Sequence, residues 1–118
     1  MNAYLIDPFA KTVTEVEYGG NYQEIYQLID CDTFDVVRIN NKGDAIFVDD
    51  EGLINGKPQA FFMYQDYPQP IAGKGLVLGS DTEGETTAPR ISFDELCDKI
   101  WWFAVRRAEP ADLDDLRF

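Results

Sequence analysis

The side chains that could do acid–base or nucleophilic chemistry here are carboxylates, lysines, tyrosines and two cysteines, because the 118 residues include no histidine. The absence of histidine excludes Ser-His-Asp and Cys-His catalysis and every metal site that uses an imidazole. Aspartate and glutamate number 22, so no pair of carboxylates stands out as an acid–base pair. Cys31 and Cys97 lack the Cys-x-x-Cys spacing of zinc and redox sites and are expected to be reduced thiols. We therefore predict a protein that is not an enzyme, with no catalytic residues, no metal and no cofactor.

A glycine-rich segment, Gly73-x-Gly75-x-x-x-Gly79, is the nearest approach to a phosphate-binding motif. It has one residue more than the dinucleotide fingerprint and precedes a predicted strand instead of opening a helix. Glycines that form turns at the two ends of a buried strand are the favoured interpretation. The alternative is a small anionic ligand of nucleotide type, held by Arg38, Tyr67, Gly73, Lys74 and Gly75.

Two further groups are candidates for contact with a protein partner. Asp81, Glu83 and Glu85 alternate in one polar loop but do not fit the twelve-residue calcium-loop pattern, so a solvated acidic turn is favoured over a metal site. Trp101 and Trp102 cannot both face the core, since adjacent side chains diverge on a strand or a helix. At least one tryptophan is therefore expected to be exposed, where the C-terminal tail covers it or where it anchors a partner or a second copy of the chain.

The charge balance limits the class of partner. With 22 acidic and 10 basic residues, the formal charge of −12 repels nucleic-acid phosphate, so we expect no direct nucleic-acid binding. The same charge attracts basic proteins, although acidity also serves solubility alone. The N-terminus lacks the features of a signal peptide and no apolar run approaches a membrane span, so a cytoplasmic protein without membrane contact is predicted.

Apolar periodicity and turn residues predict the elements that position these groups. Runs rich in β-branched and aromatic residues predict strands at residues 3–7, 12–18, 34–40, 44–49, 60–65 and 73–79, with Leu53-Ile54 as a brief continuation before a turn at residues 55–58. Asn21 is expected to cap one helix, and a Ser92-to-Glu95 capping box to begin a second that runs to about residue 100. Residues 100–103 fit either a closing strand or an anchored final turn.

These elements predict one α+β domain over residues 1–104, with a mainly antiparallel or mixed sheet of about five to six strands packed by two helices. The Leu76-Val77-Leu78 run is apolar without alternation, so its strand is expected to lie centrally. Residues 105–118 change to charged residues and alanine and are predicted to be a C-terminal tail in which Pro110 suits the first turn of a short helix.

Four stretches of the chain are similar to an uncharacterised family of short bacterial and phage-borne proteins. They are IDPFAKTVTEVEY, CDTFDVVRINNKGDAIFVDDEGL, YPQPIAGKGLVLGSDTEGE and SFDEL, and they cover about residues 4–103. The resemblance implies a compact domain in a prophage or mobile-element setting, and it transfers no activity and no catalytic residue. We therefore expect a small acidic binding protein that contacts a host protein. The alternative is a domain that binds a small, nucleotide-like ligand.

Overall fold

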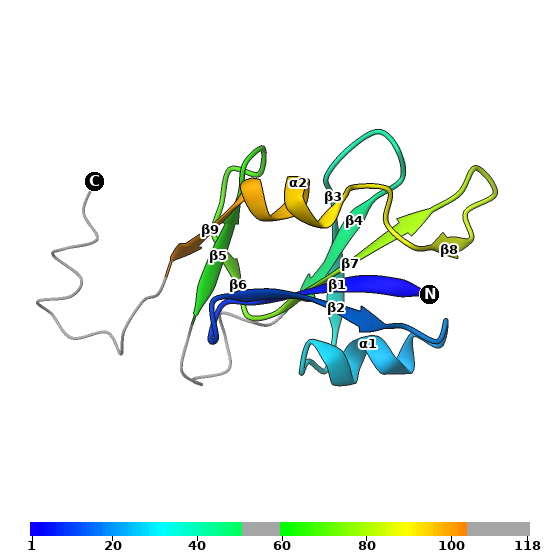
Figure 1. The fold of residues 1–118 in the computed structure, drawn as a ribbon. Coiled ribbons are helices and arrows are strands. Elements are labelled where there is room, and N and C mark those ends of the chain that lie inside the picture. The colour runs from blue at the N-terminus through cyan, green and yellow to red at the C-terminus, as the bar shows by residue number, and fades with distance from the viewer. Residues whose placement is uncertain (51–59, 104–118) are drawn as a thin grey trace, which may run out of the picture.

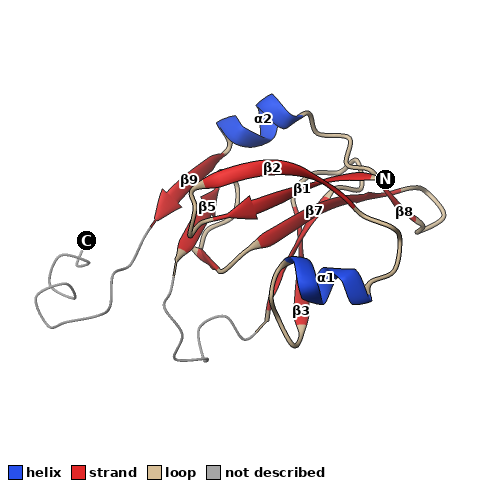
Figure 2. Ribbon diagram, turned by 60° about the horizontal axis from the view of Figure 1, so that its bottom comes forward, coloured by secondary structure: helices blue, strands red, loops and turns tan. Residues whose placement is uncertain are grey.

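A larger and a smaller antiparallel sheet make up most of the structure, a computed structural model that describes residues 1–50 and 60–103 (Figures 1 and 2). The described residues form the strands β1 (Asn2–Asp7), β2 (Thr12–Glu17), β3 (Phe34–Arg38), β4 (Ala45–Asp49), β5 (Phe61–Tyr64), β6 (Ile71–Ala72), β7 (Gly75–Ser80), β8 (Thr86–Thr87) and β9 (Ile100–Phe103), and the helices α1 (Gln23–Leu28) and α2 (Phe93–Asp98). The larger sheet has the order β2-β1-β7-β4-β3, with β8 paired to β7, and the smaller sheet has the order β6-β5-β9.

The strands predicted at residues 3–7, 12–18, 34–40 and 44–49 are present and pair as two antiparallel hairpins. β1 pairs with β2 along its whole length, from Asn2 opposite Glu17 to Asp7 opposite Thr12. β3 pairs with β4 across a turn in which Gly43 has a φ of 100°, a backbone conformation that glycine adopts without steric cost. The apolar strand β7 lies between β1 and β4, as predicted for a run without alternation.

The core lies on both faces of the larger sheet, because side chains alternate along each strand. One face belongs to a cluster that we call the α1 cluster, made of Ala3, Tyr18, Ile25, Ile29, Leu76 and Leu78. The other face belongs to the α2 cluster, made of Ile6, Val37, Ile46, Val48, Phe62, Tyr64, Ile71, Val77, Ile91, Leu96 and Ile100. The smaller sheet therefore shares a core with the α2 face of the larger sheet.

The two helices begin close to their predicted starts. The Ser92 hydroxyl accepts a hydrogen bond from the Glu95 backbone N–H at 3.2 Å, and α2 ends at Asp98. The Glu95 carboxylate lies 3.5 Å from Lys99 Nζ in an ion pair. At α1 the cap position falls on Tyr22 instead of Asn21, but Asn21 Oδ1 still accepts from the Gln23 N–H at 3.0 Å.

Two segments whose secondary structure the sequence left open, residues 100–103 and the polar loop after β7, contain strands. Residues 100–103 form the strand β9, in which Trp101 lies opposite Met63 of β5, so the closing-strand alternative is the correct one. The polar loop predicted between β7 and α2 also contains the short strand β8. The predicted continuation at Leu53-Ile54, the turn at residues 55–58 and the tail at residues 105–118 lie outside the described residues. Within the described segments, neither helix has the length and apolar character that a membrane crossing requires.

Candidate functional site

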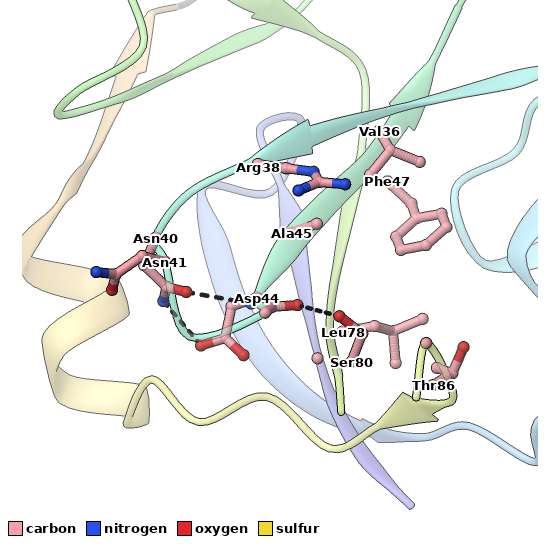
Figure 3. A pocket seen from close by; sticks show the side chains of 13 residues that line it. Val36, Arg38, Asn40, Asn41, Asp44, Ala45, Phe47, Leu78, Ser80 and Thr86 are labelled. Carbon is pink, nitrogen blue, oxygen red and sulfur yellow. Dashed lines mark hydrogen bonds between the residues drawn. The ribbon is translucent and has the colours of Figure 1, made fainter. Parts of the chain in front are cut away.

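A pocket of about 370 Å³ opens between the β3–β4 hairpin and the β7–β8 region (Figure 3). We call it the Arg38 pocket. Its apolar lining comes from Val36, Ala45, Phe47 and Leu78, and its polar lining from Arg38, Asn40, Asn41, Asp44, Ser80 and Thr86.

Strand register brings these side chains together. Val36 lies opposite Phe47 and Arg38 opposite Ala45, while Ala45 lies opposite Leu78 on the next strand. Residues directly opposite each other project from the same face of an antiparallel sheet. The pocket therefore lies on the α1 face, and its apolar lining continues into the α1 cluster through Leu78.

Asp44 is a buried carboxylate that joins the β3–β4 hairpin to the segment before α2. Its side chain is 1% exposed. Oδ1 accepts from the Arg90 backbone N–H at 2.8 Å, and Oδ2 accepts from the Ile91 N–H at 2.8 Å and from Asn40 Nδ2 at 3.0 Å. Asn40 Oδ1 in turn accepts from the backbone N–H groups of Lys42 at 2.9 Å and Asp44 at 3.1 Å. This network holds one wall of the pocket in place, and both Asp44 oxygens accept hydrogen bonds within it.

Arg38 is an exposed cation in a strongly acidic protein. Its side chain has no hydrogen bond or ion pair with any residue in the described ranges 1–50 and 60–103. Asp44 is the one acidic residue among the described residues that line the pocket, and both of its oxygens already accept hydrogen bonds from backbone amides or from Asn40. The guanidinium is therefore available to an anion from outside the chain.

The predicted ligand-binding residues do not converge on one site. Arg38 lines the pocket described above, whereas Tyr67 lines a second pocket of about 310 Å³ that also includes Asp35, Val37 and Val48. Val37 and Val48 belong to the α2 cluster, so this second pocket lies on the opposite face of the larger sheet. The two residues therefore cannot hold one small ligand together.

The glycine-rich segment is explained by turn formation and packing. Gly73 has a φ of 80° in the connection between β6 and β7. A Cβ on buried Gly75 would lie 2.8 Å from Ile46 Cγ2 and 2.9 Å from Phe62 Cζ, so glycine permits close packing there. Lys74 is half-buried between these two glycines, and none of the three lines either pocket.

The predicted partner-binding residues occupy two separate places. Asp81 Oδ1 accepts from the N–H groups of Glu83 and Glu85, each at 2.9 Å, so this carboxylate shapes the β7–β8 turn while the other two remain exposed. Trp101 is 52% exposed on β9, which is the exposure expected of one tryptophan, and Trp102 packs against the α2 cluster. Figures 1 and 2 place the β8 hairpin and β9 at opposite ends of the molecule, so these groups do not form a continuous surface.

Sequence reasoning missed Asp44 and the apolar lining of the Arg38 pocket. The signal for Asp44 was the Asn40-x-x-Gly43-Asp44 turn, because Asn and Asp side chains often bond backbone amides in turns. The signal for the lining was Val36, which follows a polar residue and precedes Val37, so that this strand has apolar residues on both faces.

Cys31 is expected to react slowly with alkylating reagents at neutral pH. Burial, together with Asp49, Asp32 and Asp30, raises the pKa of its thiol to about 11. Because only the thiolate reacts, iodoacetamide modification of folded Cys97→Ser protein should accelerate about tenfold per pH unit from pH 7 to 10 and should proceed faster in urea. Mass spectrometry of timed samples measures this rate. A rate that levels off below pH 9 would contradict the raised pKa.

Comparison with known proteins gives a family and no activity. A family model described as "Domain of unknown function (DUF3846)" matches residues 1–99, which include every residue of the Arg38 pocket. "Uncharacterized protein y4iR" of Sinorhizobium fredii (strain NBRC 101917 / NGR234) is 34% identical over 96 residues, which are 79% of this chain, and the match spans 58% of that relative's length. No solved structure matches the chain. The expected resemblance to a bacterial family is thus confirmed, and the chain belongs to the DUF3846 family, a domain of unknown function.

Proposed function

We propose that this domain is a non-enzymatic binding protein that acts through contacts with a basic protein partner. The observation that carries the proposal is the charge balance of 22 acidic and 10 basic residues. Even if every lysine and arginine formed an ion pair with a carboxylate, twelve carboxylates would have no basic partner, which is the formal charge of −12. A field of this strength raises the association rate with a cationic surface.

The exposed Trp101 is the residue that we expect to anchor the partner. Trp101 lies on β9, which has β5 as its neighbour and ends the order of the smaller sheet among the described residues. A half-exposed tryptophan on an edge strand combines a large apolar side chain with backbone groups that another strand can pair with. The carboxylates would thus steer the partner, and Trp101 would supply contact area.

The setting that we propose is the cytoplasm of a bacterium in which the gene belongs to a phage or another mobile element. A cationic groove that normally holds nucleic acid in a host protein would be the matching surface. The sequence resemblance to phage-borne proteins and the acidic charge support this setting.

We also infer that α1 and α2 are the layers that pack the larger sheet. Ile25 and Ile29 contribute to the α1 cluster, and Leu96 contributes to the α2 cluster. Their side chains are at most 2% exposed, which supports a packing role for both helices.

The test is capture of proteins from a bacterial lysate by the immobilised full chain, followed by affinity measurement with the purified partner. We expect binding at about 50 mM salt that is largely lost at about 500 mM, because salt screens exposed charges. Trp101→Ala should weaken binding at least tenfold, as expected of an aromatic hot spot. Tyr22→Ala, at a residue that is 61% exposed on a different element, is the matched control and should change little.

Three results would contradict the proposal. One is the absence of any salt-sensitive partner at low salt. Another is an equal loss of affinity in the Trp101→Ala and Tyr22→Ala proteins. The third is a dimer, seen by light scattering of the purified chain, that dissociates in Trp101→Ala, since this would assign the β9 edge to a second copy of the chain.

A further inference from the structure

We propose that the Arg38 pocket binds a small organic anion, whose charged group pairs with Arg38 and whose flat body lies on Val36 and Phe47. The volume of about 370 Å³ falls in the range of about 300–1,000 Å³ that is typical of small-molecule sites. This inference concerns a different face from the β9 edge and does not depend on a protein partner.

The charge at the pocket selects for an anion. Arg38 has no ionic partner within the described part of the chain, although the protein has a large excess of carboxylates. The carboxylate of Asp44 lines the same pocket, but the N–H groups of Arg90 and Ile91 and the amide of Asn40 already bond its oxygens. A guanidinium binds a carboxylate or phosphate through two parallel hydrogen bonds, so either group fits.

The apolar lining selects for a flat body. Val36 is 44% exposed beside half-buried Phe47, its partner on β4, and Figure 3 shows the two side chains close together with Arg38 on the same stretch of the hairpin. The Phe47 ring packs against other aromatic rings. Its centroid lies 5.4 Å from that of Phe34, and the Phe34 centroid lies 5.2 Å from that of Tyr26. A fixed aromatic ring beside an exposed valine can stack an aromatic or similarly flat ligand.

Polar groups at the rim set the orientation. Asn41 and Thr86 line the pocket and are exposed, so their side chains can bond a hydroxyl or a ring nitrogen of the ligand. Asn40 and Ser80 are already engaged, since Asn40 bonds Asp44 and the Ser80 hydroxyl donates to the Gly43 carbonyl at 3.0 Å. A nucleoside monophosphate has the required charge, flat ring and hydroxyl groups, and an aromatic carboxylate is the simpler form of the same chemistry.

The test is titration of the ¹⁵N-labelled full chain, followed by amide chemical shifts. The probes are adenosine monophosphate, adenosine, inorganic phosphate and benzoate. We expect adenosine monophosphate to shift amides of β3, β4 and β8 with a Kd on the order of 0.1 mM, and adenosine and phosphate alone to bind at least tenfold more weakly. Benzoate binding as tight as that of adenosine monophosphate would identify the carboxylate, instead of the phosphate, as the preferred anion.

Three substitutions make the test specific. Arg38→Gln should weaken binding at least tenfold, whereas Arg90→Gln removes the same charge outside the pocket and should change the Kd less than twofold, because Asp44 bonds the backbone N–H of Arg90. Val36→Glu places a carboxylate beside Arg38 and should abolish binding as well. The proposal is overturned if neither adenosine monophosphate nor benzoate shifts these amides at about 10 mM, if both arginine variants lose affinity equally, or if the shifts map to β5 and β9.

Discussion

Replacing Asp44 with alanine is expected to lower the free energy of unfolding by about 3–5 kcal/mol, because a buried carboxylate with three donors is removed. The N–H groups of Arg90 and Ile91 would be left without their acceptors. Asn40 would lose the bond from its side-chain amide. The hairpin turn and the segment before α2 would lose their connection, although they are 46 and 47 residues apart along the chain.

Urea unfolding followed by tryptophan fluorescence measures this loss, and two substitutions bracket it. Asp44→Asn keeps the shape and one acceptor oxygen but turns its amide group toward a backbone donor, so we expect about 1–3 kcal/mol. Asp66→Ala removes an exposed carboxylate and should change the stability by less than about 0.5 kcal/mol. If Asp44→Ala and Asp66→Ala cost the same, Asp44 does not hold the structure together as its hydrogen bonds indicate.

The parts of the fold that the sequence predicted are those encoded by neighbouring residues. The β3–β4 hairpin follows from two runs rich in β-branched and aromatic residues that flank the turn at Gly43, and the start of α2 follows from the spacing of Ser92 and Glu95. The central place of β7 follows from a run that is apolar on both faces. Each signal lies within about ten residues of the element that it specifies, so no tertiary information is needed.

The parts that the sequence did not predict depend on contacts between distant segments. The pairing of β9 with β5, and so the existence of a second sheet, joins residues 100–103 to residues 61–64. The Arg38 pocket needs the registers of β3, β4 and β7 together, and a shift of one residue would turn Val36 to the other face. The sequence analysis grouped Arg38 with Tyr67 as possible ligand-binding residues, but the two line pockets on opposite faces of the larger sheet, and the face of each residue depends on strand register.

Replacing Gly43 with alanine is expected to destabilise the protein by about 2–4 kcal/mol, through two separate costs. The first is the φ of 100°, which is unfavourable for any residue with a Cβ. The second is steric, because a Cβ at Gly43 would run into the Ser80 carbonyl oxygen and lie 3.0 Å from Ser80 Oγ. Ser80 cannot withdraw easily, since it belongs to β7 and its hydroxyl donates to the Gly43 carbonyl.

Gly84→Ala separates the two costs. Gly84 has a similar φ of 84°, but a Cβ there would meet no atom within 4 Å, so only the backbone cost of about 1–2 kcal/mol remains. Thermal and urea unfolding of the two variants should differ by at least about 1 kcal/mol, with Gly43→Ala less stable. Equal destabilisation would mean that the β3–β4 turn can move away from β7. In that case the Arg38 pocket, which both segments line, would have a movable wall and could admit larger ligands than its present volume allows.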